Sequence, residues 1–375
     1  MTANGTPDSH APAPSGIPGP PETATLKRVV ELAQVHLGLE RVCAVELTAT
    51  GPRYCGCAPA DADKLGFAVA PTELEGLASV PLTLSTGELF GRLCYSAVAP
   101  GAEAVARGFM AMLAEFVTPE LDQLRARGEL RESIQGLIDS DDVALAFQPI
   151  FDVRTASCLG VEVLARFPPP FPSPDRMFLR AEHVGLGLEL EELVVVRAWP
   201  ILEQLPPGRF LALNLTPPAV LALARRAHHR PDVDLSSIVI EVTEHRAIDT
   251  YGEIRRALEK LRRRGLRLAV DDAGAGYASL RHVLELRPDL LKVDRSLIHG
   301  LAGDAARQAA VSSFVSLARY LDAEVVAEGV ETEEDLDAAR RLGVDAAQGY
   351  LLGRPSTDRE RLSGWLNQDR TPEPV

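Results

Sequence analysis

The chain has 375 residues, 46% of them hydrophobic, which is enough for two domains with separate cores. Its 39 Lys and Arg against 53 Asp and Glu give a formal net charge of -14, which argues against a nucleic-acid polymer as partner. No run of residues reaches the roughly 18 apolar positions of a membrane span, so no membrane partner is expected. The five cysteines are odd in number and lack metal-site spacing, which indicates reduced thiols in a cytoplasmic protein.

The N-terminal part begins with residues 1–22, which are rich in Pro, Ala, Gly and Ser and are expected to form a disordered tail. A helical pattern starts at Thr25, and a strand-like run follows from Val42 to Leu47. After a turn-rich middle, two short strands, Ser79 to Leu84 and Leu89 to Ser96, are separated by a turn and predict a hairpin.

A second helix is predicted from Glu103 to Val117, with four side chains at core spacing, namely Phe109, Met112, Leu113 and Phe116. Residues 23–117 are therefore predicted to be a small α+β domain. The run from Val80 to Leu84 and the run from Gly91 to Tyr95 resemble the C-terminal half of a GAF sensory domain. The region where GAF domains build their ligand pocket is short here.

A connecting helix is predicted over residues 118–140, because Thr118-Pro119-Glu120 offers an N-cap, a proline at the first helical position and an acid in the first turn. Apolar residues recur along it at heptad-like spacing: Leu121, Leu124, Leu130, Ile134 and Leu137. Such spacing is typical of signalling helices that pair in a homodimer, and a simple amphipathic connector fits the same pattern.

Residues 141–370 alternate between strands and helices, such as Ile254 to Arg263 and Gln308 to Leu321. Eight apolar strands predict a closed TIM-like (β/α)8 barrel. The link between the first two strands, Asp152 to Ser157, is too short for a crossover, so the first strand should be antiparallel to its neighbour. The expected strands are Val143 to Phe151, Cys158 to Ala165, Phe210 to Leu215, Ser237 to Val242, Leu266 to Val270, Asp289 to Val293, Glu324 to Ala327 and Asp345 to Leu351.

Polar residues stand at the C-terminal ends of these strands, where a barrel places its active site. Five acids converging on one barrel mouth would repel one another unless cations neutralised them. Oxygen ligands without clustered His or Cys favour Mg²⁺ or Mn²⁺, and the number of acids suggests two ions. The residues concerned are Glu162, Asn214, Glu241, Asp271, Asp272, Lys292, Glu328 and Gln348.

From about Val143 to Pro355 the chain resembles the EAL-domain cyclic di-GMP phosphodiesterases. The resemblance rests on several short motifs that follow in family order, each weak alone and specific together. They are Phe147-Gln148-Pro149-Ile150, Glu162-Val163-Leu164, Asn214-Leu215-Thr216, Glu241-Val242-Thr243-Glu244, Asp271-Asp272-Ala273-Gly274-Ala275-Gly276, Lys292-Val293-Asp294, Glu328-Gly329-Val330-Glu331 and Gln348-Gly349-Tyr350.

The resemblance implies roles for these residues. One metal ion would be held by Glu162, Asn214, Glu241 and Asp271, and the second by Asp271, Asp272 and Glu328. Lys292 would orient the attacking water, so Lys292 and Glu328 are the expected catalytic residues. Glu244 would brace the loop after Asp272. The expected substrate-binding residues are Gln148, Arg166, Glu331 and Gln348.

The implied function is hydrolysis of cyclic di-GMP to linear pGpG by a metal-dependent phosphodiesterase. The alternative is a catalytically weak or inactive domain that binds cyclic di-GMP as an effector. Two positions depart from the family pattern. Val163 replaces an alanine, and Ala273 replaces a phenylalanine that would anchor the loop after the Asp pair.

Overall fold

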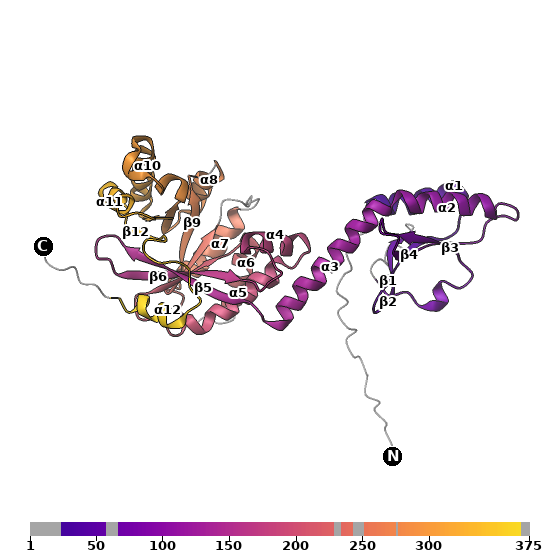
Figure 1. Ribbon diagram of the computed structural model, residues 1–375, viewed down its shortest axis with the longest axis horizontal. Helices are drawn as coiled ribbons and strands as arrows, with labels where there is room; N and C mark the ends of the chain where they lie inside the picture. The colour runs from indigo at the N-terminus through magenta and orange to yellow at the C-terminus, as the bar shows by residue number, and fades with distance from the viewer. Residues whose placement is uncertain (1–23, 58–66, 229–233, 243–250, 275–276, 369–375) are drawn as a thin grey trace, which may run out of the picture. The chain divides into compact units, whose positions relative to one another are not determined.

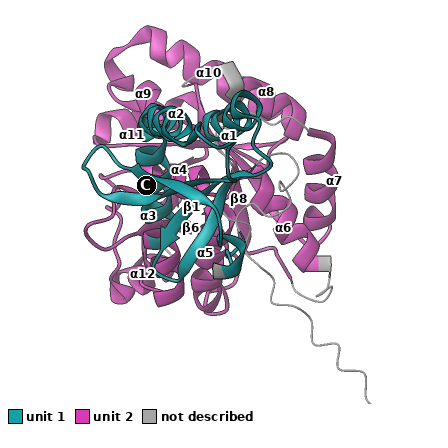
Figure 2. Cartoon of the chain, turned by 90° about the vertical axis from the view of Figure 1, so that its right-hand side faces the viewer, with its two compact units in different colours: residues 1–132 teal, residues 133–375 magenta. Residues whose placement is uncertain are grey.

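The chain forms two compact units, residues 1–132 and 133–375, which Figure 2 shows in different colours. In the described part of the chain, no helix combines the length and apolar character needed to cross a membrane. The computed structural model describes residues 24–57, 67–228, 234–242, 251–274 and 277–368.

The first unit contains a four-stranded antiparallel sheet in the order β2-β1-β4-β3, so the predicted small α+β architecture is confirmed (Figure 1). The GAF resemblance of this unit stays a prediction. Its elements are α1 (Ala24–Leu37), β1 (Val42–Thr48), β2 (Gly51–Cys57), the 3-10 helix η2 (Pro71–Glu73), β3 (Ala78–Thr83), β4 (Leu89–Tyr95) and α2 (Glu103–Phe116).

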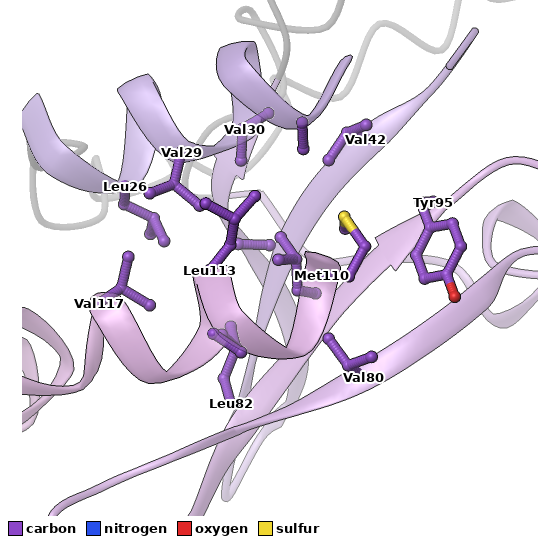
Figure 3. Close-up of a cluster of buried hydrophobic side chains, with 14 of the residues drawn as sticks. Leu26, Val29, Val30, Val42, Val80, Leu82, Tyr95, Met110, Leu113 and Val117 are labelled. Atoms are coloured by element: carbon purple, nitrogen blue, oxygen red, sulfur yellow. The ribbon is translucent and has the colours of Figure 1, made fainter. Parts of the chain in front are cut away.

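The core of this unit lies between the sheet and the helices α1 and α2 (Figure 3). Leu26 of α1 and Leu113 of α2 belong to the same buried cluster as Leu82 of β3. Along β1, Val42 and Ala44 belong to this cluster, whereas Cys43 and Val45 belong to a second cluster. Because strand side chains alternate between faces, both faces of the sheet are buried.

Two predictions for this unit were wrong in detail. Strand β2 was not predicted, because Gly51 and Pro52 at its start suggested a turn. In α2, Met112 and Phe116 were expected in the core but are 55% and 68% exposed. The helix has a second apolar stripe, which contains Met110, and this stripe faces the core instead.

The helix α3 (Thr118–Ser140) follows α2 directly. Leu121 is fully buried in the core of the first unit, and Ile134 and Leu137 are also buried. These members of the heptad-like stripe are therefore already covered within one chain. Pairing of α3 in a homodimer stays a prediction.

The second unit is a closed eight-stranded barrel with the strand order β10-β11-β12-β5-β6-β7-β8-β9. Strand β5 is antiparallel to β6, as expected from the short link between them. It is also antiparallel to β12, and the other neighbours are parallel. The strands are β5 (Ala144–Asp152), β6 (Cys158–Arg166), β7 (Phe210–Asn214), β8 (Ile238–Val242), β9 (Arg267–Ala273), β10 (Leu290–Val293), β11 (Glu324–Ala327) and β12 (Ala346–Ala347).

Helices connect the parallel strands and cover the barrel. They are α4 (Pro174–His183), α5 (Gly187–Leu202), α6 (Pro217–His228), α7 (Tyr251–Arg262), α8 (Tyr277–Leu286), α9 (Arg295–Ile298), the 3-10 helix η3 (Leu301–Gly303), α10 (Ala305–Leu321), α11 (Glu333–Leu342) and α12 (Arg359–Leu366).

The last strand is shorter than predicted, since β12 has two residues and the chain turns directly after Gln348. The backbone N–H of Gln348 still donates to the carbonyl of Ala327, and the carbonyl of Gln348 accepts from Val330. The apolar residues Leu351 and Leu352, which suggested a longer strand, pack against the cluster that lies outside the barrel.

Close packing inside the barrel can be tested at Gly160 on β6, which pairs with Phe210 on β7. A Cβ atom at Gly160 would lie 2.6 Å from Cδ2 of Phe210, so we expect Gly160→Ala to lower the free energy of unfolding by about 1–3 kcal/mol. Gly136→Ala in α3 is the matched control, because a Cβ there meets no atom within 4 Å. The control should gain about 0.5–1 kcal/mol.

Urea denaturation of the full chain measures both changes. Equal effects of the two substitutions would contradict the packing described for β6 and β7.

Candidate active site

A buried lysine joins acidic side chains from several strands at one end of the barrel. The Nζ atom of Lys292 on β10 lies 2.7 Å from Oε2 of Glu241 and 2.7 Å from Oε1 of Glu328. It also lies 3.3 Å from Oδ1 of Asp271 and 3.6 Å from Oε2 of Glu162. The barrel therefore brings together four of the predicted acids around one ammonium group.

This lysine is almost completely buried, with 1% of its surface exposed. Burial alone would lower the pKa of Lys292, but Asp271 and the three glutamates raise that pKa well above its ordinary value. The ammonium group is therefore charged at neutral pH. A charged lysine at this depth is stable only because the carboxylates surround it.

Glu162 on β6 accepts a hydrogen bond at each of its two carboxylate oxygens. Asn214 Nδ2 donates to its Oε1 at 2.8 Å, and Gln348 Nε2 donates to its Oε2 at 2.7 Å. Burial would raise the pKa of Glu162, but Lys292 and these two hydrogen bonds hold it below its ordinary value. Glu162 is thus a carboxylate whose orientation is fixed from both sides.

Glu241 and Glu328 are in a different electrostatic situation. Burial raises the pKa of each carboxyl well above its ordinary value, and neighbouring carboxylates raise it further, although Lys292 opposes the change. One ammonium group is therefore not enough to neutralise the acids. Cations at this end of the barrel would stabilise the charged form of all of them.

The two neighbouring aspartates occupy a bulge in β9. Leu291 pairs with Val270 and Val293 pairs with Ala273, so β9 has one residue more than β10 between these pairs. Asp272 has a φ of 55°, in the left-handed region that non-glycine residues rarely adopt. Bulges re-aim side chains near active sites, and this one allows two consecutive residues to serve the same site.

Three carboxylates have oxygen atoms close enough to share one cation. Asp271, Asp272 and Glu328 each offer an oxygen, and these oxygens all lie within 4.8 Å of one another. Oxygen-only ligands suit Mg²⁺ or Mn²⁺ better than softer metals. The excess of acids over the single lysine also fits bound cations.

A pocket of about 250 Å³ opens beside the cluster. Gln148 Oε1 accepts a hydrogen bond from Gln348 Nε2 at 3.0 Å, and both side chains line the pocket together with Glu162. The other lining residues are Arg295, Glu328, Gly329, Glu331, Gly349 and Tyr350.

Two pocket residues were not predicted from the sequence. Arg295 Nη2 lies 2.8 Å from Glu331 Oε1, and the Arg354 guanidinium lies 4.3 Å from the centroid of the Tyr350 ring. Arg295 directly follows the Lys292 motif, and Tyr350 ends the Gln348 motif. The position of Arg295 next to one motif and of Tyr350 within another was the only sign in the sequence that they could belong to the site.

Two glycines allow the backbone to approach closely at this pocket. A Cβ atom at Gly329, where φ is 65°, would collide with the Arg295 side chain. One at Gly349 would collide with the backbone of Val330. Any side chain at either position would displace a segment that lines the pocket.

The remaining predicted residues are placed as follows. Arg166 ends β6, donates to the carbonyl of Ala165 at 2.8 Å, and does not line the pocket. Glu244 lies outside the described residues. Thr216, in the loop after Asn214, donates to Glu191 from both its backbone N–H and its hydroxyl, a contact that the sequence did not reveal.

Ala273 stands where the family pattern has a phenylalanine that would anchor the loop. It is fully buried at the end of β9. A Cβ atom at the next residue, Gly274, would lie 2.5 Å from Leu297 Cδ1 and 3.3 Å from Phe314 Cε2. Side chains from α9 and α10 therefore fill the space beside this turn.

Comparisons with known proteins match the part of the chain that forms the barrel. Residues 129–355 match the EAL domain family model. The chain is 31% identical over 259 residues to the bifunctional diguanylate cyclase/cyclic di-GMP phosphodiesterase MucR of Pseudomonas aeruginosa, covering 64% of this chain and 36% of that protein. It is 32% identical over 235 residues to the probable cyclic di-GMP phosphodiesterase PdeD of Escherichia coli, covering 60% of this chain and 43% of that protein.

A solved structure of the PaMucR phosphodiesterase in complex with c-di-GMP is also similar, with 32% identity and a TM-score of 0.54. The match covers 62% of this chain and 99% of that one. The aligned part of the chain thus spans less than half of either curated relative but nearly all of the solved phosphodiesterase domain.

The role of Lys292 as the counter-charge can be tested through stability. In buffer containing a chelator, Lys292→Met should lower the free energy of unfolding by about 3–5 kcal/mol, because the buried carboxylates lose their cation. Added Mg²⁺ should recover part of the loss, since a bound cation stabilises only the folded state.

Lys260→Met, at an exposed position on α7, is the matched control and should have little effect. Chemical denaturation with and without Mg²⁺ measures both variants. A Lys292→Met chain as stable as the control would contradict the electrostatic description of the cluster.

Proposed function

The chain belongs to the EAL domain family, and on this premise we propose that it hydrolyses cyclic di-GMP to linear pGpG with the help of divalent metal ions. The observation that supports this most directly is the excess of acids around Lys292 at the mouth of the barrel. Such a site has the charge and the oxygen ligands for two Mg²⁺ or Mn²⁺ ions.

We assign the ligands of the two ions from the cluster and the family resemblance. Glu162, Asn214 and Glu241 would hold the first ion, Asp272 and Glu328 the second, and Asp271 would be shared. When bound, a pair of divalent ions lowers the pKa of water and stabilises negative charge on the oxygens of a phosphodiester.

Lys292 would hold and orient the water that attacks the phosphorus. Its Nζ atom lies within 3.3 Å of carboxylate oxygens of Glu241, Asp271 and Glu328, so the position of the ammonium group is fixed. A charged donor fixed in this way can orient a water molecule and stabilise developing negative charge. With Glu328, it forms the proposed catalytic pair.

The pocket beside the cluster supplies groups for the substrate. Gln148, Gln348 and Glu331 line it and would contact the nucleotide. Arg295 adds a guanidinium that can bind phosphate oxygens, and Tyr350, which is 51% exposed, offers an aromatic face to a base. Arg166 would reach a phosphate from the end of β6 after leaving its carbonyl partner.

The test is incubation of the purified chain with cyclic di-GMP and either Mg²⁺ or Mn²⁺, followed by chromatography. We expect linear pGpG as the product. Glu162→Gln removes one carboxylate oxygen ligand without a change of shape. It should lower the rate by more than the roughly 10–100-fold lost when an outer partner of a metal site is removed.

Glu334→Gln, at an exposed position on α11, is the matched control and should keep the wild-type rate. Calorimetric binding in parallel distinguishes an enzyme from an effector. Tight binding of cyclic di-GMP by the wild type without product in either metal would overturn the enzymatic proposal and support the effector.

A further inference from the structure

Three buried thiols gather on the sheet face of the first unit that is turned away from α1 and α2. Cys43 on β1 pairs in register with Cys57 on β2 and with Cys94 on β4. All three belong to one buried cluster that also contains Val45 and Tyr54. The two other cysteines of the chain, Cys55 and Cys158, lie outside this cluster.

Cys43 and Cys94 stand directly opposite each other on β1 and β4, and each thiol shifts the pKa of the other. The N–H of Ser96 donates to the carbonyl of Arg41 at 3.0 Å, two positions along from this pair. Because hydrogen-bonded pairs recur every second residue, Cys43 and Cys94 are also such a pair, with Cα atoms about 5.5 Å apart. A disulfide spans Cα separations of roughly 4.4–6.8 Å, which this pair meets. It also needs Cβ atoms about 3.5–4.5 Å apart, so the two side chains have to move closer when the bond forms.

The surroundings give the two thiols different acidities. The hydrogen bond from Cys43 lowers the pKa of the Cys94 thiol although burial opposes this, and Arg92 lowers it further. The same hydrogen bond and burial raise the pKa of Cys43. Cys94 is therefore the more reactive sulfur, because the thiolate is the nucleophile.

Purely apolar packing is the simplest role for buried cysteines. That role does not require two cysteines to stand directly opposite each other on paired strands. It also does not require a neighbouring arginine on the same face, and Arg92 lies two residues before Cys94 on β4. The pair therefore has features that packing does not explain.

We propose that Cys43 and Cys94 form an oxidisable thiol pair, which hydrogen peroxide converts to a cross-strand disulfide. The Cys94 thiolate attacks one peroxide oxygen and breaks the O–O bond, which gives a sulfenic acid and, after protonation, one water. The Cys43 sulfur then displaces the hydroxyl group of the sulfenic acid, which leaves as a second water with the last thiol proton. Two thiols and one peroxide thus become one disulfide and two waters.

The segment from Phe67 to Leu77 packs against the cluster that contains the pair. Val69 is buried in the thiol cluster, and Leu74 and Leu77 pack against it. Backbone hydrogen bonds from Val69 to Pro52 and from Tyr54 to Phe67 attach this segment to β2. A short segment held by few backbone bonds can open locally without unfolding of the sheet, which would admit a small oxidant.

The experiment exposes the full-length chain to hydrogen peroxide, blocks the remaining thiols in denaturant, and measures the intact mass and the linked peptides. We expect two fewer blocked thiols than in the reduced chain, a peptide linking residues 43 and 94, and complete reversal by dithiothreitol. Cys43→Ser and Cys94→Ser should each lose this linked peptide. Circular dichroism shows whether each variant keeps the wild-type fold.

Cys158→Ser and Cys57→Ser are the matched controls, because each removes one buried thiol and leaves the proposed pair intact. Both should form the 43–94 link at the wild-type rate. Linkage of Cys43 to Cys57 instead, or no disulfide at peroxide levels that oxidise exposed methionine, would overturn the proposal. The wild-type peptide map decides between these outcomes even if a variant fails to fold. This inference does not depend on the proposed hydrolysis of cyclic di-GMP.

Discussion

The ion pairs of Lys292 are the interaction on which the mouth of the barrel depends. The strands bring acids from β6, β8 and β9 and the residue after β11 to within 3.6 Å of one Nζ atom. Each acid alone would be unstable as a buried anion. Together they require a cation, and the lysine supplies one positive charge where the acids carry several negative ones. This imbalance is the physical basis for proposing metal ions.

The same charges explain why the surrounding polar residues are arranged as they are. Glu162 is held by the amide groups of Asn214, at the end of β7, and of Gln348, directly after β12. Gln348 also donates to Gln148. The bulge in β9 turns two consecutive aspartates to one site at the cost of a left-handed residue. An orderly site of this kind is preorganised for electrostatic catalysis, because its groups need little movement when charge develops.

Much of the barrel could be predicted from the sequence, because apolar strands that end in polar residues give a clear periodic signal. The antiparallel β5 followed from a link that is too short for a helix. The bulge at Asp271 and Asp272 could not be predicted, since it depends on pairing with β10. Arg295, beside one motif, and Tyr350, within another, were missed because a place in the sequence does not show which pocket a side chain lines.

Predictions for the first unit were less accurate than those for the barrel. Strand β2 begins with Gly51 and Pro52, which indicate a turn rather than a strand. In α2, apolar residues occur on two stripes, and periodicity alone does not tell which stripe faces the core. The pairing of Cys43 with Cys94 likewise depends on strand register, which the spacing of cysteines in the sequence does not reveal.

The central claim is that the acids around Lys292 bind two divalent ions. Anomalous X-ray diffraction from crystals containing Mn²⁺ and cyclic di-GMP tests it most directly, because it locates the ions without relying on activity. The account predicts two manganese peaks, one beside Glu162 and Glu241 and the other beside Asp272 and Glu328, with Asp271 between them. Crystals with bound nucleotide and no manganese peak at these carboxylates would contradict it.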